Sequence, residues 1–162
     1  MVAYRIADGR HPIFSSMGAV LYGGRWNSAG LAAIYAAETY AAAMLEVLVH
    51  VNSPRPPRTH QFVRIEIPER VSVETADTGA IEGWADVDPV FARGFGDRWF
   101  KEKRSAVLRV PSVVTQGPEM NLVINTEHAD FRWIKADAPR PVLWDARLFP
   151  GGVKFGAKGK RQ

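Results

Sequence analysis

The segment from Leu31 to His50 constrains the fold of this chain most strongly. It reads LAAIYAAETYAAAMLEVLVH, and its alanine and leucine content favours an α-helix. We therefore predict one helix over residues 31–50. Tyr35 and Glu46, eleven residues apart, would then share nearly one helix face and lie about 16 Å apart along the axis. At that distance the two side chains cannot touch, but they can bracket an elongated ligand.

Glu46 is an unusual residue in such an apolar segment, and it has two interpretations. Ala42 and Ala43, one helical turn earlier, are small enough to leave room for a ligand beside the carboxylate. Alternatively, these alanines pack beneath a neighbouring strand and Glu46 pairs with a buried arginine. Glu38, closer to the start of the predicted helix, is interpreted as a solvated group or as one that stabilises the helix through its dipole.

The rest of the chain contains short apolar segments that are typical of strands. They read AYRIA, HQFVRIEIP, VSVET, AVLRVPSVV, MNLVIN and PVLWDARLF. One more helix is predicted over GDRWFKEKRS, residues 96–105. This order predicts an α+β fold with a mainly antiparallel sheet and a few helices. We expect one domain over residues 1–150 and a flexible basic tail over residues 151–162.

The composition excludes several kinds of function. The chain has no cysteine, so disulfide, thiol-nucleophile and zinc-thiolate chemistry are excluded. Its four histidines do not follow a metal-ligand spacing, so no metal site is expected. We find no segment typical of a signal peptide or a membrane span, and we expect a cytoplasmic protein without membrane contact.

The net charge of +4 arises from the C-terminal end of the chain. Residues 151–162 hold four basic residues and no acid, so the preceding part carries 17 basic and 17 acidic groups. A neutral body argues against direct nucleic-acid binding, which usually needs a basic face. The tail either keeps the protein soluble or docks a partner.

Two further residues are candidates for a site. Arg25 follows Gly23 and Gly24, and a glycine turn with a guanidinium suits a phosphate group. The alternative is a surface arginine beside a core Trp26. Ser112 follows a proline in an apolar strand, where its hydroxyl needs a partner, although the backbone at a bulge would also satisfy it.

A third region, NLVINTEHADF, brings three polar residues to a strand end. It places Asn121, Asn125 and His128 there. We expect Asn125 and His128 to close a turn rather than to contact a substrate.

Taken together, these segments resemble the RES-domain family, which is named for an arginine, a glutamate and a serine. The matching segments are GGRWNSAG, IYAAETYAAAMLEVLVH, VLRVPSVV, NLVINTEHADF and PVLWDARLF, within residues 3–149. The resemblance implies a fold like that of diphtheria-toxin-type ADP-ribosyltransferases. It also implies a toxin of a bacterial toxin–antitoxin module that consumes NAD+ as a substrate, by hydrolysis, by phosphorolysis or by ADP-ribose transfer to a protein. The implied partner is a helix-turn-helix antitoxin that blocks the active site.

The resemblance also implies roles for individual residues. Glu46 and Arg25 are the expected catalytic pair, with Glu46 facing the ribose. Arg25, Tyr35 and Ser112 are the expected NAD+-binding residues: Arg25 on the pyrophosphate or adjacent ribose, Tyr35 stacked on nicotinamide, and Ser112 orienting the sugar or the arginine. Ser105, seven residues before Ser112, is the alternative serine.

Other classes of function stay open at this point. A glycosidase or nucleosidase would use Glu46 with a second acid such as Asp86 or Asp145. A non-enzymatic module would bind a partner peptide on the helix face. A ribonuclease toxin is disfavoured by the neutral body and by the lack of paired histidines.

Overall fold

The computed structural model describes residues 1–51 and 55–149 of the chain, in which eight strands and three α-helices are seen. The predicted tail over residues 151–162 lies outside this part. The strands are β1 (Val2–Asp8), β2 (Ala33–Ala37), β3 (His60–Glu66), β4 (Val73–Thr75), β5 (Val107–Pro111), β6 (Met120–Asn125), β7 (Lys135–Ala136) and β8 (Arg140–Pro141). The helices are α1 (Met17–Tyr22), α2 (Tyr40–His50) and α3 (Val90–Lys101), with short 3₁₀ turns at Thr78–Ala80, Ala129–Trp133 and Ala146–Leu148.

The strands form one sheet in the order β4-β5-β6-β2-β1-β3-β7, and β8 pairs with β3. The β4–β5 pair is parallel and the other described pairs are antiparallel. The predicted α+β class with a mainly antiparallel sheet is therefore confirmed.

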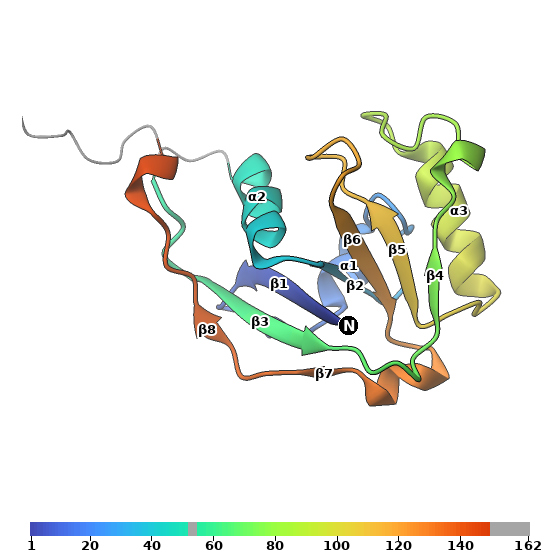
Figure 1. Ribbon diagram of the computed structural model, residues 1–162, viewed down its shortest axis with the longest axis horizontal. Coiled ribbons are helices and arrows are strands. Elements are labelled where there is room, and N and C mark those ends of the chain that lie inside the picture. The colour runs from blue at the N-terminus through green and yellow to red at the C-terminus, as the bar shows by residue number, and fades with distance from the viewer. Residues whose placement is uncertain (52–54, 150–162) are drawn as a thin grey trace, which may run out of the picture.

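The sheet opens between β1 and β2. These two strands share a single residue pair, Tyr4 with Ala37, whereas β1 pairs with β3 along its whole length. Figure 1 shows α2 standing over this junction, while α3 runs beside β4 and β5. The sheet thus has two halves that meet at one point beneath α2.

The predicted helix over residues 31–50 is wrong in its first half. Residues 33–37 form β2, which pairs along its length with β6. Thr39 then caps α2 by accepting a hydrogen bond from the Ala42 amide, 3.1 Å away. Pairing in the sheet therefore overrides the helix propensity of the alanines, and Tyr35 does not share a helix face with Glu46.

Two other predicted elements differ from the structure. Of the last predicted strand, PVLWDARLF, only its first residue, Pro141, belongs to a strand, β8. Further along this segment, Asp145 caps a 3₁₀ turn by accepting a hydrogen bond from the Arg147 amide at 2.9 Å. The helix predicted from Gly96 begins earlier, at Val90. Residue 96, inside α3, is a glycine at a close contact, because a β-carbon there would overlap the Trp26 carbonyl oxygen. This glycine allows α3 to pack directly on the loop that carries Arg25.

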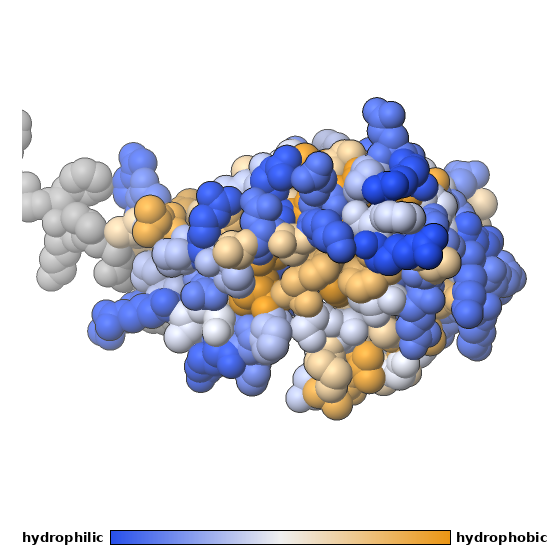
Figure 2. Space-filling view, turned by 90° about the horizontal axis from the view of Figure 1, so that it is seen from below, coloured by the Kyte–Doolittle hydropathy of each residue, from blue (hydrophilic) through white to orange (hydrophobic). Residues whose placement is uncertain are grey.

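Apolar residues are also found on the surface. Seen from below in Figure 2, hydrophobic side chains reach the surface between hydrophilic ones. Apolar atoms contribute much of any protein surface, so this face alone does not indicate a binding site. Among the helices described here, none is long and apolar enough to cross a membrane.

Candidate active site

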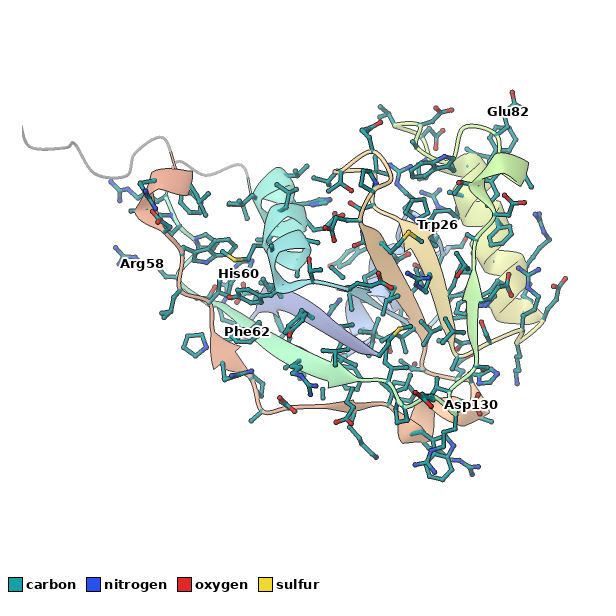
Figure 3. The ribbon with its side chains drawn as sticks, viewed as in Figure 1. Trp26, Arg58, His60, Phe62, Glu82 and Asp130 are labelled. Carbon is teal, nitrogen blue, oxygen red and sulfur yellow. The ribbon has the colours of Figure 1, made fainter. Side chains whose placement is uncertain are left out.

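A cavity of about 690 Å³ lies where the sheet opens beneath α2. Strands β1, β2 and β6, helix α2, the loop around Arg25 and the end of β5 all contribute to its walls. Its lining includes Arg5, Arg25, Tyr35, Glu46, His60 and Asn121. Trp26 is another lining residue, and in the view of Figure 3 Trp26 and His60 lie on opposite sides of α2. The cavity therefore extends from one side of this helix to the other.

Glu46 reaches the cavity from α2, with its carboxylate held from one side. The Ser112 hydroxyl and the Asn121 side-chain amide both donate to Oε1, each at 2.7 Å. Oε2 has no hydrogen-bond partner in the described part of the chain, so it is the oxygen left for a ligand. Ala42 and Ala43 pack against β1 and β2, as one interpretation predicted. The same interpretation paired Glu46 with a buried arginine, and this part is wrong, because Glu46 bonds Ser112 and Asn121 instead.

The two candidate serines lie in different places. Ser112 follows the end of β5 and is buried, and its hydroxyl contacts Glu46 rather than Arg25. Ser105 lies in the core, where its hydroxyl donates to the Val107 carbonyl and accepts from the Trp99 indole. Ser112 does not line the cavity itself, but it is the serine whose hydroxyl holds the carboxylate of a cavity residue, Glu46.

Tyr35 lies on β2 and is one of the residues that line the cavity. Its hydroxyl donates to Asn27 Oδ1 at 2.6 Å and accepts from the Trp26 amide at 3.1 Å. Burial raises the pKa of the Tyr35 phenol well above its usual value. The phenol is therefore neutral in the physiological range and ties β2 to the loop of Arg25.

Arg25 is carried by a tightly fixed loop. A β-carbon on Gly24 would come within 2.5 Å of the Tyr35 hydroxyl, so this glycine allows the loop to pack on Tyr35. Ser28 bonds the Asp97 carboxylate of α3 through its amide and its hydroxyl, at 2.7 and 2.6 Å. Arg25 Nη1 donates to two backbone carbonyls, those of Trp84 and Asp86, at 3.0 and 2.7 Å. These bonds fix the guanidinium of a cavity-lining residue, and no acidic partner of it is found in the part of the chain that the structure describes.

Arg5 is a second cavity arginine, and the sequence reasoning missed it. It lies in the gap between β1 and β2, where Nε donates to the Ile13 carbonyl and Nη1 to the Tyr35 carbonyl, at 2.7 and 2.8 Å. Burial lowers the pKa of its guanidinium from the usual value. Nη2 has no hydrogen-bond partner within the residues described. The only signal in the sequence is an arginine in the middle of a predicted strand.

Asn121 was also given no role by the sequence, because its position at a strand end indicates nothing about Glu46.

The expectation for Asn125 and His128 is confirmed: Asn125 Oδ1 accepts from the Glu127 amide and His128 Nδ1 from the Asp130 amide, which closes the turn after β6. Glu38 lies just before α2, and its partly exposed carboxylate is paired rather than free in solvent. Its carboxylate pairs with Arg109 of β5 at 2.6 Å, away from the cavity lining.

The charges around the cavity are unequal. Glu46 is the only carboxylate among the described lining residues, which also include two arginines, Arg5 and Arg25. Asp86 does not line the cavity, and Asp145 is occupied by Arg147. This arrangement weighs against a glycosidase with two acids, which needs its carboxyl groups on both sides of one bond.

The fold and the cavity together define a class of protein: a small α+β domain whose opened sheet holds one acid and two cations, a set suited to a ligand with sugar and anionic groups. The comparison with protein families is more specific. The RES domain profile matches residues 2–145, and the chain belongs to the RES-domain family.

Individual relatives agree with this membership. A protein of Sphingobium sp. named "Prs ADP-ribosylating toxin" is 42% identical over 139 residues, which cover 83% of this chain and 85% of that protein. A protein of Photorhabdus laumondii named "Toxin Res" is 34% identical over 134 residues, with 81% and 85% covered. The toxin–antitoxin complex MbcT–MbcA of M. tuberculosis includes a chain of similar fold, with a TM-score of 0.70 at 18% identity and 87% and 83% coverage.

Proposed function

We propose that this chain is the toxin of a toxin–antitoxin module and that its residues 1–150 form one domain that cleaves the nicotinamide–ribose bond of NAD+. The family membership and the names of its relatives support the toxin assignment. The observation that carries the chemistry is the geometry of Glu46, a cavity-lining residue whose Oε1 accepts from two donors while Oε2 has no hydrogen-bond partner among the described residues.

The chemistry fits a single carboxylate. Breaking this bond builds positive charge on the ribose, as in glycoside hydrolysis. A fixed carboxylate beside that carbon stabilises the charge and can accept a hydrogen bond from a ribose hydroxyl. Nicotinamide leaves as a neutral ring from a cationic one, so the bond can break without a general acid. A cavity with one carboxylate is therefore sufficient for this step.

The other lining residues suit the remaining parts of NAD+. We assign the pyrophosphate or the adjacent ribose to Arg25, with Arg5 as a second cation, because both guanidiniums bond only carbonyls in the described structure. We assign the nicotinamide ring to Tyr35, an aromatic residue of the cavity lining whose hydroxyl is already bonded to Asn27. Ser112 contributes by orienting Glu46.

The acceptor of ADP-ribose is the finer part of the proposal. The relative with 42% identity has the name of an ADP-ribosylating toxin, which favours a protein acceptor over water or phosphate. We further propose that an antitoxin, of helix-turn-helix type by family resemblance, covers the cavity, and the toxin–antitoxin complex of the structural neighbour supports such a partner. The family resemblance also leads us to assign the fold to the diphtheria-toxin type.

Mass spectrometry of the products of NAD+ tests both parts. The purified protein is incubated with NAD+ alone, with phosphate, and with cell extract, and each mixture is searched for nicotinamide. An ADP-ribose adduct on an extract protein is the expected result. Free ADP-ribose or a phosphorylated ADP-ribose would replace the protein acceptor by water or phosphate. No nicotinamide in any mixture would refute the cleavage of NAD+.

A further inference from the structure

Asn121 stands at the start of β6 and meets α2 across the edge of the cavity. Its amide nitrogen donates to the same Glu46 oxygen as the Ser112 hydroxyl, at the same distance of 2.7 Å. The two donors come from different segments, the start of β6 and the loop after β5. Together they fix the head group of a side chain that extends from a third element, α2.

The orientation of the Asn121 amide follows from the charge of Glu46. With Nδ2 on the carboxylate, the carbonyl oxygen Oδ1 is buried and has no hydrogen-bond partner within the described structure. The reverse orientation would place two acceptor oxygens against each other. A buried carbonyl without a partner is unfavourable, so packing and folding alone would favour an apolar residue here, as at the next three positions of β6.

From this contact we propose that Asn121 is a positioning residue for Glu46. Its amide and the Ser112 hydroxyl occupy Oε1, which fixes the torsion of the carboxylate and turns Oε2 toward the sugar. Asn121 acts through Glu46 and does not bind the substrate itself. This inference rests on the proposed NAD+ cleavage, and it adds a residue that the arginine–glutamate–serine set does not include.

Two variants of similar size remove the amide donor. Asn121→Asp replaces the donor by a carboxylate oxygen, and Asn121→Leu replaces it by an apolar group. The matched control is Asn125→Asp, at the other end of β6, where a carboxylate can still accept from the Glu127 amide. Nicotinamide release from NAD+ gives kcat and KM for each variant, and thermal unfolding shows whether each is folded.

We expect both Asn121 variants to lose about 10- to 100-fold in kcat, because a misplaced catalytic group reduces the rate by up to that order. KM should stay within about twofold of the wild-type value, because substrate binding uses other residues. The control should keep both constants. In a Glu46→Gln background, Asn121→Leu should cause no further loss of kcat, since its effect passes through Glu46.

The possible outcomes separate this inference from the proposed function. Wild-type protein that releases no nicotinamide would overturn both. Wild-type release together with an unchanged kcat in a folded Asn121 variant would overturn the positioning role alone. A rise in KM without a fall in kcat, or a full further loss in the Glu46→Gln background, would also overturn it, because Asn121 would then act on the substrate directly.

Discussion

The hydroxyl of Tyr35 ties β2 to the loop of Arg25, and Tyr35→Phe removes this tie while it keeps the ring. The change leaves Asn27 Oδ1 and the Trp26 amide without their partner, and Asn27 is fully buried. An unsatisfied buried polar group costs about 1–3 kcal/mol, so we expect a loss of about 2–4 kcal/mol in the free energy of unfolding. For a domain of this size, that loss corresponds to a fall of roughly 5–15 °C in Tm.

Thermal unfolding followed by tryptophan fluorescence measures this effect directly. Tyr22→Phe is the control, because Tyr22 is 84% exposed and its change should leave Tm nearly the same. The KM for NAD+ should rise less in Tyr35→Phe than in Tyr35→Leu, which also removes the ring. A Tm for Tyr35→Phe equal to that of the control would refute the argument that this hydroxyl holds the loop.

Three further predictions concern the surroundings of the cavity. Gly96→Ala should lower Tm by several degrees, because the new β-carbon overlaps the Trp26 backbone; an unchanged Tm would contradict this close approach. Ser112→Ala should lower kcat for nicotinamide release by roughly 10-fold or more, since it removes one charge-assisted hydrogen bond to the carboxylate. Equal rates in the two proteins would argue against that role. Arg25→Ala should weaken NAD+ binding by roughly 10-fold or more in calorimetric titration, and unchanged titration heats would exclude Arg25 from binding.

The class of the fold could be predicted from the sequence because most strands are short alternating or apolar segments between turn residues. β3, β4, β5 and β6 fall within segments predicted as strands, and β1 extends one residue beyond its predicted segment at each end. The division of residues 31–50 could not be predicted from propensity, because the same alanines suit a helix and a buried strand. Pairing of β2 with β6, a contact distant in sequence, decides the outcome. The Thr39 cap is the one local signal of the boundary.

The site was partly predictable for a related reason. Arg25, Tyr35 and Glu46 all line the cavity, although the helical spacing used to relate Tyr35 to Glu46 is wrong. The contacts that organise Glu46 come from residues 66 and 75 positions further along the chain. Such distances are set by the sheet order, so single-sequence reasoning has no access to them. Arg5 was missed for the same reason, because its exposure to the cavity depends on the opening between β1 and β2.

The central claim is that the Glu46 carboxylate stabilises the cleavage of NAD+, and nicotinamide release by Glu46→Gln tests it most directly. Glutamine has nearly the same shape, and its oxygen can still accept from Ser112 and Asn121. We therefore expect an unchanged Tm, NAD+ binding close to that of the wild type, and a fall of at least about 10²-fold in kcat. Glu38→Gln, whose carboxylate pairs with Arg109 outside the cavity, should keep the wild-type rate. Nicotinamide release by Glu46→Gln at the wild-type rate would contradict the account.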